Sequence, residues 1–323
     1  MSPSIAIIMP VYNDWEACGY LLADLDQALL AWPGRIDIVL LDDGSSQHPP
    51  TGIGTGLQRI DTVSILRMRR NLGHQRSICV GLSYIEQEAR HSHVVVMDAD
   101  GEDRPQDVPR LLEISQREPG KVVFARRTRR SEGLIFRLGY HCFRTIHRLL
   151  TGQDIRFGSF SVVPRGPLRA ITVSAELWNH FAGCVLATRV PYIAADTIRG
   201  TRYAGKSTMN LPSLMVHGLS AISLFAPVIG SRLIALFGAV SMLAVIAMLV
   251  LAAIRIFTDQ AIPGWASILS GISLLALLQS ILFIVTFTFL VLGARSQATV
   301  IPARDCKLFV DTVTLVGTRH GNN

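Results

Sequence analysis

The sequence predicts an α/β fold with a mostly parallel sheet, followed by two helices long enough to cross a membrane. The first observation is that short apolar, β-branched runs alternate with helical patterns through residue 125, which is typical of a parallel sheet covered on both faces. The second is that residues 233–254 and 260–294 carry no charged side chain. Each stretch exceeds the roughly 20 residues that span a bilayer as a helix, and a buried core helix is rarely apolar on every face for so long.

The elements of the predicted sheet domain follow one another in a regular order. Strands are expected at residues 4–9, 36–41, 63–66, 94–97 and 122–125, and helices at residues 15–31, 74–89 and 106–117. The carboxyl ends of parallel strands meet at one edge of a sheet, and the loops there normally bind the ligand. Those loops carry Tyr12-Asn13-Asp14, Asp42-Asp43 and Asp98-Ala99-Asp100. An acidic ligand-binding edge is therefore expected.

Residues 134–150 have the pattern of a two-faced helix. One face is apolar, and the other carries Arg137, His141, Arg144 and Arg148. Such a basic face is either solvated or turned toward anionic lipid or phosphate, and we favour the second interpretation.

A third helical pattern, at residues 207–231, precedes the first apolar stretch. It is uncharged but interrupted by Pro212 and Pro227, and a helix between those prolines is short for a membrane span. We expect an amphipathic juxtamembrane helix here, with a third span as the less favoured alternative.

Composition narrows the class of partner. The net charge of +7 suits nucleic acid, an anionic membrane surface or a phosphorylated substrate, and the apolar stretches favour the last two over nucleic acid. The five cysteines lie far apart without a CxxC pair, which predicts reduced, buried thiols and neither disulfides nor a zinc site. The N-terminal segment lacks the features of a signal peptide and is interpreted as the first strand.

Charges around the apolar stretches predict an orientation in the membrane. Basic residues flank the pair of stretches at Arg202, Lys206, Arg232, Arg295, Arg304 and Lys307. The loop between the stretches holds only Arg255 and Asp259. The positive-inside rule then places the sheet domain and both termini in the cytosol. The tail at residues 295–323 has short apolar patches that suit strands folding back on that side, and no role is assigned to it.

Asp98 and Asp100 are the residues around which the chemistry is expected. Two carboxylates one residue apart at a strand end can share a hard divalent cation, which in turn bridges a diphosphate. A single DxD pattern also occurs by chance in exposed turns. Its position directly after an apolar strand and before Arg104-Pro105 favours a functional site.

Five motifs in this order resemble one family of enzymes. They are IMPVYND, LLDDGS, RRNLGHQRSICVGL, MDADGEDRP and, near residues 199–208, RGTRYAGKST. The sequence is identified as similar to the family 2 glycosyltransferases of GT-A fold. Within that family it resembles the dolichyl-phosphate mannose synthase and bactoprenol glucosyltransferase group. The resemblance covers residues 5–294.

The resemblance implies a division of the chain. A Rossmann-like GT-A catalytic domain is expected at residues 1–206, the juxtamembrane helix at 207–231, transmembrane helices at 232–256 and 262–294, and a cytosolic tail at 295–323.

It also implies roles for individual residues. The nucleotide-sugar pocket would be formed by Pro10, Tyr12, Asn13, Asp14, Asp43, Asn71, Gly73, Gln75 and Asp98. Tyr12 would lie near the base, and Asp43 would contact the base or ribose. From the residues alone, Asp43 can instead cap the turn before Gly44, and residues 71–75 can simply be a loop and helix start.

The cation expected from the resemblance is Mg²⁺ or Mn²⁺, held by Asp98 and Asp100. Glu102 stands where these enzymes usually have Gln, and it is a candidate third ligand.

The acceptor phosphate would contact Arg127, Arg202 and Ser207. Thr208 replaces the family lysine, with Lys206 two residues away. Arginine forks match phosphate oxygens, although each arginine alone can equally form a surface ion pair.

Ser159 is a second departure, because the family often has Asp at this place, proposed as a base or acceptor contact. An alcohol acceptor would need such a base. A phosphomonoester has a second pKa near 6 and is already anionic at neutral pH. Ser159 therefore favours a phosphate acceptor, or else a specialised or inactive branch. Glu176 is a second candidate for the missing carboxylate.

The predicted function is inverting transfer of a sugar from a UDP- or GDP-sugar to polyprenyl phosphate at the cytosolic membrane face. The alternatives are transfer to another membrane lipid or glycan, and a non-catalytic membrane scaffold on a decayed transferase fold. Partners would be the nucleotide-sugar, the lipid phosphate and membrane lipids, with homo-oligomerisation left open.

Overall fold

The computed structural model describes residues 3–127, 148, 152, 157–205, 225–258, 264–296 and 300–319. The chain forms two compact units. The first comprises residues 1–139, 155–224 and 299–323, and the second comprises residues 140–154 and 225–298. The predicted basic helix at 134–150, the juxtamembrane residues 207–224 and the loop around Asp259 lie largely or wholly outside the described residues.

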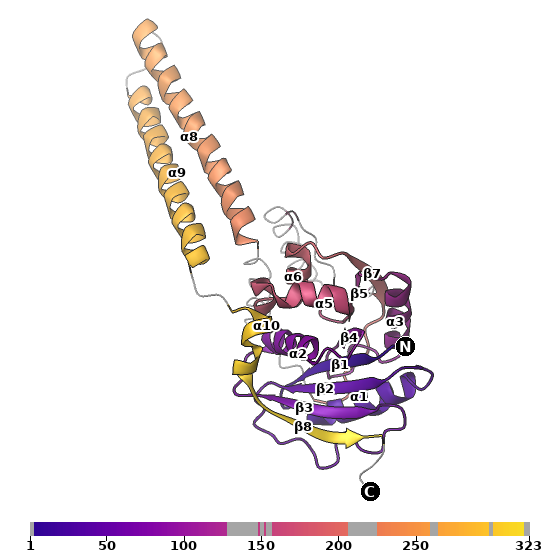
Figure 1. Ribbon diagram of the computed structural model, residues 1–323. Helices are drawn as coiled ribbons and strands as arrows, with labels where there is room; N and C mark the ends of the chain where they lie inside the picture. The colour runs from indigo at the N-terminus through magenta and orange to yellow at the C-terminus, as the bar shows by residue number, and fades with distance from the viewer. Residues whose placement is uncertain are drawn as a thin grey trace. The chain divides into compact units, whose positions relative to one another are not determined.

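The first unit is built on an eight-stranded sheet with the order β7-β5-β6-β4-β1-β2-β3-β8 (Figure 1). The strands are β1 (Ile5–Val11), β2 (Ile36–Asp42), β3 (Thr62–Met68), β4 (His93–Val96), β5 (Val122–Arg127), β6 (Ser161–Pro164), β7 (Tyr192–Thr197) and β8 (Val310–Thr318). Strands β4, β1, β2 and β3 are mutually parallel, as are β5 and β7, whereas β6 and β8 run antiparallel to their neighbours. The predicted mostly parallel sheet is confirmed.

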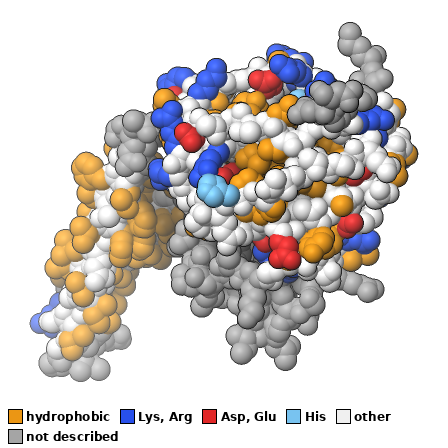
Figure 2. Space-filling view, turned by 90° about the horizontal axis from the view of Figure 1, so that it is seen from below, with side chains coloured by type: hydrophobic (Ala, Val, Ile, Leu, Met, Phe, Trp, Pro, Cys, Tyr) orange, Lys and Arg blue, Asp and Glu red, His pale blue; other side chains and the backbone are white. Residues whose placement is uncertain are grey.

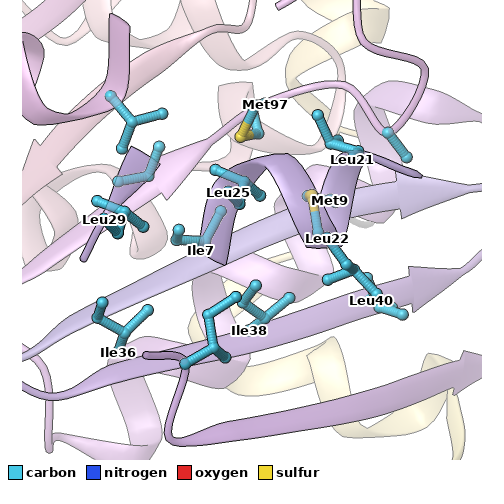
Figure 3. Close-up of a cluster of buried hydrophobic side chains, with 14 of the residues drawn as sticks. Ile7, Met9, Leu21, Leu22, Leu25, Leu29, Ile36, Ile38, Leu40 and Met97 are labelled. Atoms are coloured by element: carbon cyan, nitrogen blue, oxygen red, sulfur yellow. The ribbon is translucent and has the colours of Figure 1, made fainter. Parts of the chain in front are cut away.

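Helices cover both faces of this sheet. Those described in the first unit are α1 (Trp15–Ala28), α2 (His74–Glu88), α3 (Asp107–Arg117), α5 (Arg165–Thr172), α6 (Phe181–Ala187) and α10 (Pro302–Asp305), with 3-10 turns η1 (Ala175–Trp178) and η2 (Cys306–Phe309). Alternate residues of β1 enter opposite clusters. Ile7 packs with Leu25 of α1 (Figure 3), and Ile8 packs in the cluster that includes Ile78 of α2. A strand buried on both faces accounts for its continuous apolar run.

The sequence interpretation found the first five strands but not β6 and β7. The stretch that becomes β6 has only four residues, and β7 has a mostly exposed burial pattern. Strand β6 joins the sheet through β4, to which it runs antiparallel, and β5 and then β7 follow outside β6. Short strands of this kind gain their stability from neighbours far away in the sequence, which a local pattern does not reveal.

The C-terminal tail belongs to the first unit. The tail was expected as a segment of its own, but its strand β8 pairs with β3 at the sheet edge, with Leu66 opposite Val313. The Phe309 ring lies 4.5 Å from that of Trp178, centroid to centroid. The predicted strand is therefore confirmed. The tail is part of the sheet domain and not a separate segment, because β8 satisfies the outer backbone groups of β3.

The second unit contains the two apolar helices α8 (Ala226–Phe257) and α9 (Trp265–Ser296). Helix α8 begins six residues before the predicted 232, so residues 226–231 are part of it and not of a juxtamembrane helix. Pro227 lies in its first turn, where proline is favoured since the missing N–H has no helical partner there. The rings of Phe237 and Phe283 stack between the helices at 4.7 Å.

Both helices are candidate membrane spans, over Ala226–Phe257 and Ser267–Gly293. In each, only 6% of the most apolar window is buried within the protein. A helix of 27 residues extends about 40 Å at 1.5 Å per residue, more than the roughly 30 Å of a bilayer core. Figure 2 shows the surface of this pair dominated by hydrophobic side chains. Such a surface is expected in contact with lipid.

Candidate functional site

The loops after β1 and β2 are joined by Asn13. Its backbone is in the left-handed region, with φ of 57°, which asparagine tolerates better than most residues. The Asn13 N–H donates to Ser45 Oγ at 3.0 Å, and its Oδ1 accepts from the Gln47 N–H at 3.0 Å. Tyr12, which precedes it, is half-exposed. Pro10, also expected in the nucleotide pocket, lies within β1 opposite Leu41.

Asp43 connects the end of β2 to the start of α2. Its two carboxylate oxygens accept from the Leu72 N–H at 2.7 Å and the Gly73 N–H at 2.9 Å. Burial raises the pKa of Asp43, although these hydrogen bonds oppose the rise. The turn-capping role belongs to its neighbour, since Asp42 accepts from the Ser45 N–H at 2.8 Å.

The loop after β2 lies very close to the segment that precedes α2. A Cβ at Gly44 would lie 2.7 Å from the Asn71 nitrogen, and Gly44 itself has a φ of +72°. Only glycine accommodates both conditions easily. Asn71 and Gly73 therefore lie beside the loop after β2, in the region where the nucleotide pocket was expected.

Asp98 and Asp100 follow β4 at the same edge. Asp98 Oδ1 is shielded from solvent and, among the described residues, accepts no hydrogen bond. His74 Nε2 lies 3.4 Å from it. Burial and the neighbouring Asp100 charge raise the pKa of Asp98 to about 6. A buried carboxylate oxygen that accepts no hydrogen bond suits a divalent cation.

Asp100 is held by two groups from nearby segments. Its Oδ1 accepts from the Glu102 N–H at 2.9 Å, and its Oδ2 pairs with Arg202 Nη1 at 2.8 Å. Burial raises the pKa of Asp100. Arg202 also forms an ion pair with Asp14, and its Nε donates to the Ala204 carbonyl at 2.9 Å. Arg202 therefore joins the loops after β1 and β4.

Glu102 has a different environment from the one expected of a metal ligand. Arg199 Nη2 lies 2.7 Å from each of its carboxylate oxygens, and Arg127 Nη1 lies 3.6 Å away. The described part of the chain contains no group of three or more His, Cys, Asp or Glu arranged to hold a metal. The third-ligand interpretation of Glu102 thus gains no support, because its charge is already matched by Arg199.

Asp103 is a site residue that the sequence interpretation did not identify. It is 3% exposed. Its Oδ2 accepts from the Asp98 N–H at 3.0 Å, and its Oδ1 accepts from Arg127 Nη2 at 2.9 Å. Burial and the Asp98 charge raise the pKa of Asp103 to about 7, against the effect of Arg127. The only sequence signal was its place within the MDADGEDRP motif.

Ser159 and Gln75 come together from distant parts of the chain. Gln75 Nε2 donates to Ser159 Oγ at 3.2 Å, and Gln75 Oε1 accepts from the Phe181 N–H at 2.9 Å. Because Gln75 is the second residue of α2, this contact places Ser159 at the amino end of that helix. The second base candidate, Glu176, accepts from Ser174 Oγ.

The structure thus brings together most residues predicted for the site. Described contacts link Asn13, Asp14, Asp43, Asn71, Gly73, Asp98, Asp100, Glu102, Arg127 and Arg202 in one region around the loops after β1, β2 and β4. No contact of the described residues joins Glu176 to Asp98, Asp100 or Ser159. Ser207 lies outside the described residues.

Comparison with known proteins identifies the family of this chain. Residues 6–171, just over half of the chain, match Glycosyl transferase family 2. An undecaprenyl-phosphate 4-deoxy-4-formamido-L-arabinose transferase of Erwinia tasmaniensis is 26% identical over 248 residues, covering 72% of this chain and 73% of that protein. The bactoprenol glucosyl transferase of Shigella phage SfX is 25% identical over 226 residues, covering 68% and 73%.

A solved structure shares the fold. Glucosyl-3-phosphoglycerate synthase from Mycobacterium tuberculosis, in complex with Mn²⁺, UDP-glucose and phosphoglyceric acid, superposes with a TM-score of 0.50 at 15% identity, covering 71% of this chain and 80% of that one. The parallel sheet, the acidic edge and the family match lead to one conclusion: the chain is a glycosyltransferase that belongs to glycosyltransferase family 2 and has the GT-A fold.

Proposed function

We propose that this enzyme transfers a sugar, with inversion, from a UDP- or GDP-sugar to a polyprenyl phosphate at the cytosolic face of a membrane. The observation that carries the proposal is the alternation of carboxylates and guanidinium groups at one sheet edge, where Arg202 pairs with Asp14 and Asp100 while Arg127 pairs with Asp103. The names of the two relatives refer to undecaprenyl phosphate and to bactoprenol, and both support the same acceptor class.

Asp98 and Asp100 would hold the Mg²⁺ or Mn²⁺ ion. The Asp98 Oδ1 atom, which accepts no hydrogen bond from the described residues, fits this role, and Asp100 would exchange Arg202 for the cation. When bound, the cation neutralises the charge that develops on the departing nucleoside diphosphate. The half-exposed Tyr12 ring and the loop held by Asp43 would receive the nucleotide.

The acceptor phosphate would be bound by Arg127 and Arg202, and by Ser207 outside the described residues. One of its anionic oxygens attacks the anomeric carbon of the sugar. The bond from that carbon to the diphosphate oxygen breaks, and its electron pair leaves with the nucleoside diphosphate. No proton needs to be removed, because the phosphate is largely ionised at neutral pH. Ser159, which bonds to Gln75, is then sufficient where other family members have a carboxylate.

The second unit would anchor the enzyme. Helices α8 and α9 supply two spans, and the basic flanks predict that the sheet domain and both ends of the chain lie in the cytosol. A lipid-borne phosphate would then remain at the membrane surface, on the side where nucleotide-sugars are available.

A donor panel tests the proposal. Membranes containing the protein are incubated with polyprenyl phosphate and radiolabelled UDP- or GDP-sugars, and label in the organic phase is counted. One donor is expected to yield a lipid product that depends on Mg²⁺ or Mn²⁺. Product formed equally well from free polyprenol, or no product with any donor, would refute the proposed acceptor.

A further inference from the structure

Each carboxylate oxygen of Asp103 accepts a hydrogen bond from a different part of the site. One oxygen accepts from the Asp98 main-chain N–H at 3.0 Å, and the other from Arg127 Nη2 at 2.9 Å. The side chain is nearly excluded from solvent. A buried carboxylate with both oxygens engaged by donors has a fixed orientation, because losing either contact would leave a polar atom unsatisfied.

The two partners serve different halves of the proposed reaction. Asp98 belongs to the pair that would hold the cation and the donor diphosphate. Arg127 would bind the acceptor phosphate. Among the described contacts, its guanidinium pairs with Asp103 and, at 3.6 Å, with Glu102. The spacing between the cation position and the arginine is therefore set through one side chain.

Asp26 shows what a purely structural aspartate looks like in this protein. It is also buried, at 4% exposed, and its oxygens accept from the N–H groups of Gln58, Arg59 and Ile60. All of its donors are main-chain groups of one loop. Asp103 differs because one of its two oxygens holds a cationic side chain of the site.

We propose that Asp103 is a positioning residue that holds the Asp98 main chain and the Arg127 guanidinium at a fixed separation, so that an oxygen of the acceptor phosphate reaches the anomeric carbon of the bound donor. The proposal rests on the proposed function, since it assigns Asp98 to the donor side and Arg127 to the acceptor side. Reactions of two bound partners are sensitive to small displacements of this kind.

The test uses the full chain in detergent and the variant D103N. Asparagine has a single acceptor oxygen and an amide that donates, so it can accept from the Asp98 N–H or from Arg127 but not from both. Loss of a group that orients a metal ligand typically lowers metal affinity about 10- to 100-fold. We expect a loss of this size in Mn²⁺-dependent nucleoside diphosphate binding by calorimetry, together with a raised KM for polyprenyl phosphate.

Two variants separate positioning from general stability. D26N should lower the melting temperature and leave Mn²⁺-dependent binding unchanged. R127Q keeps the bond from Asp103 to Asp98, so it should raise the KM for the acceptor and leave nucleotide binding nearly intact. If D103N does not fold, Asp103→Glu, which keeps the charge and displaces both oxygens, replaces it in the same comparison.

The outcomes are distinct. D103N that lowers the melting temperature as D26N does, with nucleotide binding and acceptor KM unchanged, would overturn the positioning role and leave the proposed function standing. Wild-type protein whose nucleotide affinity is the same with and without Mn²⁺ would refute the cation site and the positioning role together.

Discussion

Replacing Arg202 with alanine removes the side chain that lies between the two predicted halves of the site. In the structure Arg202 pairs with Asp14 and with Asp100, at 2.8 Å for the latter, and its side chain is 21% exposed. In the absence of substrate, the Arg202 guanidinium is therefore bound by two carboxylates. Once a cation occupies Asp100, the guanidinium is available for the acceptor phosphate.

The expected effect therefore differs between the two ligands. A hydrogen bond to a charged group contributes about 1.5–3 kcal/mol, so losing the contact to the acceptor phosphate should lower lipid-product formation roughly ten- to a hundred-fold. Mn²⁺-dependent nucleotide binding should not fall. Because Arg202 competes with the cation for Asp100, that binding is expected to stay constant or to become tighter.

Two assays measure this difference. Lipid product is counted in the organic phase with polyprenyl phosphate at fixed donor, and nucleotide binding is followed by calorimetry with and without Mn²⁺. Arg304, which is 68% exposed and pairs with its neighbour Asp305, is the matched control, and R304A should change neither quantity. Equal losses of product formation and nucleotide binding in R202A would show that Arg202 acts on the donor, and the reasoning would be wrong.

Four further predictions follow from the same structure. Asp100→Ala should abolish Mn²⁺-dependent nucleotide binding in calorimetry, whereas equal affinity with and without Mn²⁺ in the wild type would remove the basis for a metal role. Ser159→Ala should reduce product formation much less than R202A, and an S159A variant as inactive as D100A would refute a mechanism without a protein base. A cysteine placed at Asp259 in a cysteine-free background should react with an impermeant thiol reagent from outside intact cells, and labelling only after permeabilisation would invert the proposed topology. Burial raises the pKa of Asp37, but hydrogen bonds from His91 and other neighbours outweigh this effect and lower the pKa to about 2. The stabilisation is therefore present above the unfolded pKa near 4 and is lost as pH falls toward 2. D37N should lower the free energy of unfolding by about 1–2 kcal/mol at neutral pH and flatten the loss of thermal stability below pH 4, and an unchanged pH profile would contradict this.

The sequence alone was sufficient for the central strands and for the acidic edge. Strands β1, β2 and β4 are mostly apolar runs that are followed by acidic loops, and both features are local in the chain. Since parallel strands place their carboxyl ends together, the sequence is enough to assign Asp43, Asp98 and Asp100 to one edge. The two apolar helices were equally visible, because length and the absence of charge are properties of the sequence itself.

The partners of individual side chains were decided by the tertiary structure. Asp42 and Asp43 are adjacent and chemically identical, yet Asp42 caps the turn while Asp43 holds the start of α2. Glu102 and Asp103 are likewise neighbours, but one faces Arg199 and the other joins Asp98 to Arg127. Successive side chains leave the backbone in different directions, so neighbours meet different segments, such as Leu72 for Asp43 and Arg199 for Glu102.

The position of the tail shows the same limit at the level of topology. The pattern of residues 310–318 is compatible with a strand, but its partner β3 lies more than 200 residues earlier in the chain. An edge strand is chosen by which backbone groups remain unpaired once the sheet has formed, and no local feature of the sequence records this. The sequence by itself therefore determined the fold class, the acidic edge and the two apolar helices, whereas the sheet edge, the role of Asp103 and the pairing of Arg202 arose only when distant segments packed together.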